Sequence, residues 1–435
     1  MWYCKRRNRQ STQRSFKKIK IDNLVYYYIN ININIMQNQP ILNIGCLGSV
    51  SHGKSTMVYQ LTGTKTQRHS DEKIRNITIK PGYANLKIWE KINGEYETTN
   101  SESCIDNATL VHHLSFVDCP GHHELLLVML SSVSLMKGAI VVVSATESIL
   151  KNHQLIQHLA AAKISALENL IIIFNKLDLI SKDKAIKHKE ELDELLIKLK
   201  IKPRYIIPAV LNKKIGLQNI IKAIMEVFPP KLLESSDAET PEFRITRSFD
   251  INKPGINWNE IKGGVFGGSL LSGIFKIGDE IEISPGQYKK EKNGKFTVIP
   301  IITTIKSIQT DKNNLEILYP GGLTAIGTDI DAYYCKDDKL AGSLVGIKGT
   351  LPMVYQEIII NITLTTDFDG NWSPKCNDNV CLQIGNINTE ATLIELDENK
   401  FKFKLSKPVC IPNNSLIIVC SNNNEIKIVG FGKLD

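Results

Sequence analysis

The sequence predicts an α/β P-loop domain followed by two small β-barrel domains, and three observations support this prediction. A Gly-x4-Gly-Lys-Ser loop joins an apolar run to a helix-like segment near the N-terminus. Apolar runs then alternate with segments of helical period as far as residue 230, which is typical of a mostly parallel sheet. From about residue 241 the period shortens to two and glycine turns become frequent. We expect the α/β domain over 37–235 and the barrels over 236–350 and 351–435.

Composition and charge restrict the function classes. The chain has 435 residues, is 42% hydrophobic and carries a net charge of +8. Residues 1–36 hold eight Lys or Arg and one acidic residue, so the remaining body is nearly neutral and any nucleic-acid contact must come from a local patch. No apolar run approaches the ~20 residues that span a bilayer, so we expect no membrane association.

Residues 1–36 differ from the rest of the chain. The segment is basic, almost free of acidic residues, and ends in alternating Ile and Asn before Met36. An organellar transit peptide is one interpretation. The other, which we favour, is a disordered extension ahead of a start at Met36.

The nine cysteines form no C-x-x-C pair, which argues against a structural zinc site and a disulfide framework. We expect a reducing compartment, in which Cys46, Cys119, Cys410 and Cys420 are small core residues.

The loop after the apolar run 41–46 has the residue types that bind phosphate. Gly48 and Gly53 allow backbone N–H groups to turn inward, and the following helix directs its positive dipole end at the same anion. Lys54 would reach the β- and γ-phosphates, and the Ser55 hydroxyl would bind Mg²⁺. The residues predicted to bind nucleotide here are Gly48, Val50, Ser51, His52, Gly53, Lys54, Ser55 and Thr56.

Further apolar runs suit buried parallel strands, and the polar motifs follow their carboxyl ends. These runs are 114–117, 139–143, 170–174 and 205–207, and the segment 182–200 has helical period with Leu192, Leu195, Leu196 and Leu199 on one face. Ligand chemistry is expected at this edge of the sheet.

Two loops would complete the phosphate and magnesium site. Asp118 follows the strand 114–117 and can hold Mg²⁺ through water, while the Gly121 N–H can bond the γ-phosphate. Thr78 lies in the loop 75–79 and can bind Mg²⁺ only when GTP is present, which makes an order–disorder switch. His122 is the candidate for positioning the hydrolytic water, and His123 is its competitor.

The stretch Asn175-Lys176-Leu177-Asp178 follows the strand 170–174 and indicates guanine. The Asp178 carboxylate can accept hydrogen bonds from the guanine N1–H and 2-amino group, which adenine does not offer in that arrangement. Asn175 would brace the base and the phosphate loop, and the stem of Lys176 would cover a base face. The alternative for Asp178 is a helix N-cap.

The sequence pattern in the second half of the chain predicts short strands. Residues 263–269 and 273–286 combine strand-like alternation with Gly and Pro-Gly turns, and a break falls at 349–352. Strands are then expected over 358–365, 392–396, 401–405, 416–420 and 426–429.

Together, the segments 48–55, 118–122 and 175–178 resemble the translational GTPases of the elongation factor Tu class. The first switch, at 75–85, is similar to that of the gamma subunits of eukaryotic and archaeal initiation factor 2. So are 247–255 and 262–269, at the start of the first barrel, and 319–323 in a later strand. The resemblance covers about 37–435.

The resemblance implies a cytoplasmic GTPase that uses GTP/GDP and Mg²⁺. It implies delivery of initiator methionyl-tRNA to the small ribosomal subunit, with GTP hydrolysis on start-site selection. An alpha subunit is expected on the first barrel and a beta subunit on the GTPase domain. The tRNA acceptor end would lie against the GTPase domain and the first barrel. GTPase-activating and nucleotide-exchange factors are further expected partners.

The chain departs from the family pattern at two places. Residues 88–111 contain only Cys104 where many members have a zinc knuckle, so we predict no zinc. The fifth guanine motif falls at Val210, Leu211 and Asn212 without its usual Ser, although backbone N–H groups there can still contact the guanine O6.

Two rival functions remain at this point. One is a different carrier, either an organellar elongation factor Tu, which the basic N-terminus favours, or a selenocysteine-specific factor. The switch sequence at 75–85 argues against both. The other is a scaffold with a degenerate GTPase, which the weak fifth motif allows and the intact Lys54, Thr78, Asp118, His122 and Asp178 oppose.

Overall fold

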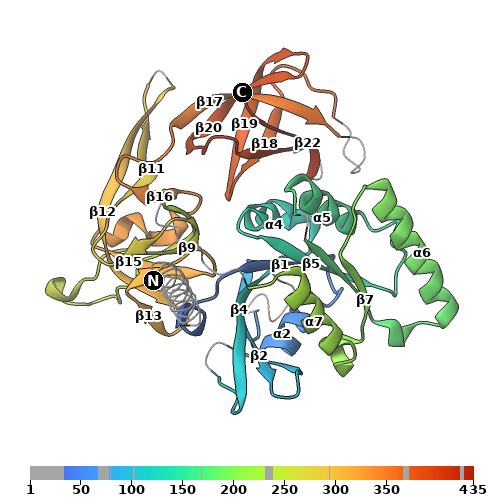
Figure 1. Ribbon diagram of the computed structural model, residues 1–435. Coiled ribbons are helices and arrows are strands. Elements are labelled where there is room, and N and C mark those ends of the chain that lie inside the picture. The colour runs from blue at the N-terminus through green and yellow to red at the C-terminus, as the bar shows by residue number, and fades with distance from the viewer. Residues whose placement is uncertain are drawn as a thin grey trace, which may run out of the picture.

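The computed structural model describes residues 34–66, 78, 80–100, 103–167, 169–230, 239–292, 294–365, 372–421 and 426–435 (Figure 1). Most of the predicted extension 1–36 therefore lies outside the described residues. Within residues 34–38 the backbone is helical, and Ile35 and Met36 are buried. Met36 packs against Trp89 and Leu110 of the α/β domain.

The first domain contains a seven-stranded sheet with the order β3-β2-β4-β1-β5-β6-β7. Strands β4, β1, β5, β6 and β7 are parallel, as predicted, whereas β2 pairs antiparallel with both β4 and β3. This antiparallel edge was not predicted, although Ala84, Leu86 and Ile88 alternate with polar residues and are buried. The strands are β1 (Asn43–Leu47), β2 (Gly82–Lys91), β3 (Tyr96–Thr99), β4 (Ala108–Asp118), β5 (Gly138–Ser144), β6 (Leu170–Asn175) and β7 (Tyr205–Pro208).

Helices cover both faces of this sheet (Figure 1). Helices α2 (Lys54–Thr62) and α7 (Leu217–Val227) pack on one face. Helices α4 (Leu126–Val133), α5 (His153–Ile164) and α6 (Lys182–Lys198) pack on the other. The predicted apolar face of α6 and the turn after it is confirmed, because Leu192, Leu195, Leu196 and Leu199 are all buried. None of the described helices combines the length and apolarity needed to cross a bilayer.

The second domain is the first predicted barrel. Its strands follow the order β11-β16-β8-β9-β15-β12-β13, and antiparallel pairing of β11 with β12 closes the sheet on itself. A core of aliphatic and aromatic residues, including Phe243 and Phe266, fills the interior. The strands are β8 (Glu242–Phe249), β9 (Val265–Ser272), β10 (Phe275–Lys276), β11 (Glu280–Lys290), β12 (Phe296–Thr310), β13 (Asn313–Leu315), β14 (Ile317–Leu318), β15 (Thr324–Thr328) and β16 (Leu344–Ile347).

The third domain is the second predicted barrel, closed in the order β17-β20-β19-β18-β21-β22. Strand β18 was not predicted, but the other five overlap predicted runs. The strands are β17 (Val354–Leu364), β18 (Asn379–Ile384), β19 (Ile387–Asp397), β20 (Lys400–Cys410), β21 (Leu416–Ser421) and β22 (Lys427–Leu434). The buried thiols of Cys410 and Cys420 belong to this barrel, as expected of core residues.

The segment before β1 bridges the first domain and the first barrel. The Gln39 side chain donates to the Tyr319 carbonyl (2.9 Å) and accepts from the Tyr319 N–H (3.2 Å). In β1, the Asn43 side chain donates to the Ser269 hydroxyl at 3.0 Å and to the Gly322 carbonyl at 3.3 Å. The first domain and the first barrel are therefore tied together by buried polar contacts.

Candidate nucleotide-binding site

A cavity of about 320 Å³ lies at the carboxyl ends of the parallel strands. Every residue that lines this cavity is among the residues predicted from the sequence. They are Val50, Ser51, Gly53, Lys54, Ser55, Thr56, Thr78, Gly121, His122, Asn175, Lys176 and Asn212. Six other predicted residues lie behind or beside the lining, namely Gly48, His52, Asp118, Asp178, Val210 and Leu211.

The two loop glycines occupy positions that other residues would not tolerate. Gly48 and Gly53 have φ values of 130° and 109°, in the left-handed region. A Cβ at Gly48 would lie 2.2 Å from the Val142 carbonyl oxygen of β5. Gly53 is the N-cap of α2 and supplies no side-chain cap, so the first N–H groups of the helix are free to donate to an anion.

Lys54 is held inside the loop. Its Nζ donates to the carbonyls of Gly48 and Ser49, both at 2.8 Å. Burial lowers the pKa of Lys54, and the nearby Asp118 carboxylate opposes that shift. A Cβ at Gly121 would lie only 2.5 Å from this Nζ and 2.7 Å from the Val50 N–H nitrogen. The predicted glycine at 121 is thus required by close approach to the phosphate loop.

The three residues predicted to bind Mg²⁺ lie together. The Ser55 hydroxyl donates to Asp118 Oδ2 at 2.7 Å and lies 3.4 Å from the Thr78 hydroxyl. Two hydroxyls and a carboxylate are the oxygen ligands that a hard divalent cation accepts, so this donor set suits Mg²⁺. Thr66, which was not predicted, also donates to Asp118 Oδ2, at 2.6 Å. Within the described ranges no three His, Cys, Asp or Glu residues cluster as a metal site.

Asn175 connects the phosphate loop to the segment before α7. Its Nδ2 donates to the His52 carbonyl (2.9 Å), and its Oδ1 accepts from the Leu211 N–H (3.1 Å). The Val210 N–H donates to the Ile215 carbonyl (3.1 Å). Of the three residues at the degenerate fifth motif, Asn212 alone lines the cavity.

Asp178 lies beside the cavity in a short 3-10 helix, η2 (Leu177–Leu179). It forms an ion pair with Lys213 at 2.9 Å, and this hydrogen bond lowers the pKa of Asp178. The alternative reading as a helix N-cap fails here, because Ser181 caps α6 by accepting from the Lys184 N–H. The carboxylate is therefore not the N-cap of α6 and pairs with Lys213 beside the cavity instead.

His122 lines the cavity directly after Gly121. Its side chain is 34% exposed, and its Nδ1 lies 3.9 Å from a Glu124 carboxylate oxygen. The side chain of its competitor, His123, lies outside the described residues. The cavity thus presents an imidazole beside the glycine that approaches the phosphate loop.

Polar residues of α5 and of the segment before it contact the phosphate loop, and no local sequence pattern predicted these contacts. His158 of α5 accepts the Gly48 N–H at its Nδ1 (3.1 Å), and burial lowers the pKa of His158 to about 3, which keeps this acceptor neutral. The Ser49 hydroxyl donates to Asn152 Oδ1 at 2.6 Å. The His52 imidazole is buried against Val142 and Glu147 and does not face the cavity.

Comparisons with known proteins agree with this geometry. Residues 39–230 match the elongation factor Tu GTP-binding domain family, and residues 263–335 match elongation factor Tu domain 2. The chain is 33% identical over 423 residues to the eukaryotic translation initiation factor 2 subunit gamma of Encephalitozoon cuniculi, covering 93% of this chain and 95% of that one. It is 36% identical over 403 residues to the translation initiation factor 2 subunit gamma of Pyrococcus furiosus, covering 91% and 97%.

Solved structures of lower identity share the fold. A bacterial selenocysteine-specific elongation factor superposes with a TM-score of 0.69 at 19% identity. That match covers 91% of this chain and 58% of the other, so this chain spans little more than half the length of that factor.

Proposed function

This chain belongs to the gamma subunits of eukaryotic and archaeal translation initiation factor 2, within the elongation factor Tu class of translational GTPases, and we propose that it carries initiator methionyl-tRNA in a GTP-dependent manner. Family membership favours this function over the rival elongation factors and over a scaffold without GTPase activity. The proposed destination is the small ribosomal subunit in the cytoplasm, with GTP hydrolysis on start-site selection.

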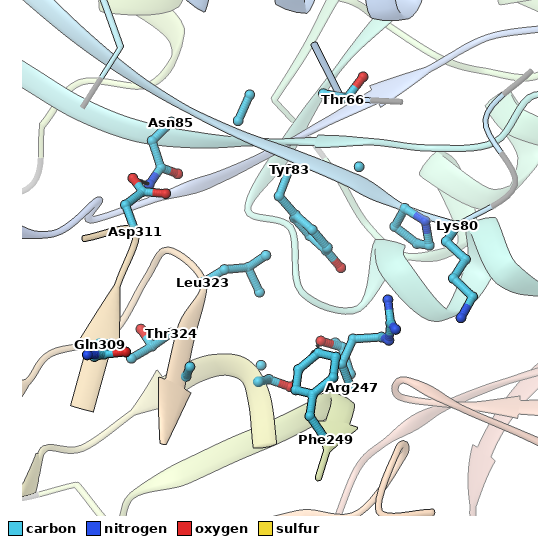
Figure 2. A pocket seen from close by; sticks show the side chains of 17 residues that line it. Thr66, Lys80, Tyr83, Asn85, Arg247, Phe249, Gln309, Asp311, Leu323 and Thr324 are labelled. Atoms are coloured by element: carbon cyan, nitrogen blue, oxygen red, sulfur yellow. Dashed lines mark hydrogen bonds between the residues drawn. The ribbon is translucent and has the colours of Figure 1, made fainter. Parts of the chain in front are cut away.

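One observation supports the tRNA part of the proposal most directly. A cleft of about 390 Å³ separates the start of β2 from the first barrel, and its lining includes Lys80, two residues after Thr78 (Figure 2). Figure 2 shows Tyr83 pointing from β2 toward Arg247 and Phe249 of the barrel. Aromatic rings and a guanidinium suit the stacked base and phosphate of a single-stranded RNA end. The cleft is therefore the proposed place of the acceptor end.

The nucleotide site supplies the GTP dependence. We propose that Ser55, Thr78 and Asp118 hold Mg²⁺, and that Lys54 and the first N–H groups of α2 hold the phosphates. When bound, Mg²⁺ would neutralise charge that develops on the β- and γ-phosphates. Gly121 approaches the loop closely enough for its N–H to report the γ-phosphate, and His122 would orient the attacking water.

Guanine would be read by Asp178, with Lys176 over a base face and Asn212 at the rim. Asn175 would keep these two halves of the site in register through its bonds to His52 and Leu211.

The remaining proposed partners follow from the family. They are an alpha subunit on the first barrel, a beta subunit on the GTPase domain, a GTPase-activating factor and a nucleotide-exchange factor. Co-purification with alpha and beta subunits would test the first two directly.

Binding of labelled tRNA to the full chain tests the central proposal. We expect initiator methionyl-tRNA to bind more tightly with a non-hydrolysable GTP analogue than with GDP, and more tightly than elongator aminoacyl-tRNA. Preference for an elongator or selenocysteinyl-tRNA would overturn the proposed substrate. Equal uptake of ATP and GTP in a calorimetric titration would overturn the nucleotide assignment.

A further inference from the structure

A polar bridge joins the loop of the proposed switch residue to the first barrel. Lys80 lies two residues after Thr78, and its Nζ is 3.6 Å from Oδ2 of Asp338. Asp338 ends the 3-10 helix η7 (Lys336–Asp338) of the barrel. The two side chains are 46% and 30% exposed, so the pair is only partly screened by solvent.

The same carboxylate holds Arg247, in β8. Arg247 Nε donates to both carboxylate oxygens of Asp338, at 2.9 and 3.0 Å, and the Ser248 N–H donates to Oδ1 at 3.0 Å. Asp337 and Asp338 have φ values of 56° and 59°, a conformation that is uncommon without glycine. The contacts to Arg247 and Ser248 therefore hold this backbone conformation, which places the Asp338 carboxylate between the cationic groups of Lys80 and Arg247.

Arg247 belongs to the cleft assigned to the tRNA acceptor end. Its guanidinium lies over the Phe249 ring, 5.2 Å from the ring centroid. Figure 2 shows Lys80 and Arg247 at the same end of the cleft, whereas Asp311 lies at the far end, where it accepts from Asn85 at 2.5 Å. Lys80, Arg247 and Asp338 therefore set the charge of one end of the cleft.

We propose that Lys80, Asp338 and Arg247 form an electrostatic coupler between the nucleotide site and the tRNA cleft. With Thr78 beside Ser55, the side chains of Lys80, Arg247 and Asp338 lie together, and these three described side chains carry a net charge of +1, which favours an RNA phosphate. Because Lys80 is only two residues from Thr78, at most about 7 Å of chain, we infer that withdrawal of Thr78 also draws Lys80 away from Asp338. Arg247 and Asp338 then neutralise each other, and the attraction for phosphate falls.

This coupler rests on the proposed function, and it assigns to Lys80 a positioning role rather than a contact with nucleotide. The cavity lining supports that distinction, because Lys80 lines the cleft and not the nucleotide cavity. Lys80 is expected to change how strongly GTP promotes tRNA binding while leaving GTP binding itself unchanged.

The test measures the dissociation constant of initiator methionyl-tRNA for the full chain with a GTP analogue and with GDP. For Lys80→Met we expect affinity to fall about three- to fivefold with the GTP analogue, the range of a partly exposed ion pair, and to stay unchanged with GDP. Asp338→Asn should instead raise affinity in the GDP state, because Arg247 is no longer neutralised. A merely structural defect would lower affinity in both states.

Lys348→Met is the matched control. It removes a surface ion pair of the same barrel, with Glu280 at 3.2 Å, and neither of these residues lines the cleft. The GTP dissociation constant without tRNA should remain within about twofold of wild type for all three variants. Linkage requires that tRNA and GTP affect each other's affinity equally. The increase in GTP affinity caused by tRNA should therefore be about three- to fivefold smaller in Lys80→Met than in wild type.

Wild-type protein that binds no initiator tRNA in either state would overturn the proposed function and the coupler together. Wild-type protein that binds tRNA, with an unchanged ratio of GTP-state to GDP-state affinity in Lys80→Met, would overturn the coupler alone.

Discussion

Replacing Asn175 with Ala should remove the hydrogen bonds that connect the phosphate loop to the guanine side of the site. Asn175 is 4% exposed, and its side chain bonds the His52 carbonyl and the Leu211 N–H at 2.9 and 3.1 Å. Alanine leaves both backbone groups buried without this partner, at a cost of about 1–3 kcal/mol each. We therefore expect a total loss of about 2–6 kcal/mol, shared between stability and nucleotide binding.

Calorimetric titration with GTP and GDP measures the loss in nucleotide affinity, and denaturant unfolding measures the loss in the free energy of unfolding. Because about 1.4 kcal/mol is tenfold in affinity, we expect both nucleotides to bind about ten- to a hundredfold more weakly. Asn386→Ala is the control, since it removes a comparable bond, from Asn386 Nδ2 to the Ile245 carbonyl at 2.7 Å, far from the site. That variant should lose stability and keep its affinity. A folded Asn175→Ala protein that binds GTP within twofold of wild type would refute the bracing role.

Three further predictions follow from the site. Asp178→Asn should shift nucleotide preference from GTP to XTP, and unchanged preference in a competition assay would show that the base is read elsewhere. His122→Ala should bind GTP normally but lose about a hundredfold or more in turnover stimulated by the activating factor, and wild-type turnover would reject its role. Burial lowers the pKa of His112 to about 4 and of His113 and His158 to about 3. Since the unfolded chain binds these protons near pH 6.5, stability should fall by up to about 1.36 kcal/mol per histidine per pH unit as the pH drops from 6.5 toward 4. Urea unfolding across that range checks the slope, and a flat profile would contradict it.

The predicted site residues that lie together around one cavity come mostly from local patterns. Each of the loops at 48–56, 118–122 and 175–178 follows a buried strand, and parallel strands bring their carboxyl ends to one edge. The cavity lining therefore contains only residues that the sequence had already indicated. Thr78 follows no predicted strand and was placed by the resemblance of 75–85 to a first switch, and it lies 3.4 Å from Ser55.

The parts that were missed depend on contacts between distant segments. Thr66 reaches Asp118 across 52 positions, and His158 accepts from Gly48 across 110, with no spacing rule that connects them. The antiparallel strand β2 was overlooked because its short alternation follows a loop expected to act only as a switch. At the fifth motif, the N–H groups of Val210 and Leu211 are used inside the protein. Only the tertiary structure shows that they are already committed.

The segment that precedes β1 limits how the molecule can transmit a signal. Gln39 exchanges two hydrogen bonds with Tyr319, and Gly321 and Gly322 press against the backbone of Ile41 and Pro40 so closely that a Cβ would lie within 3 Å of it. A hinge motion at this seam would have to break all of these contacts at once. They therefore oppose rotation of the first barrel relative to the first domain. The proposed signal from the nucleotide is therefore expected to pass through the loop that carries Thr78 and Lys80, while the contacts at this seam stay in place.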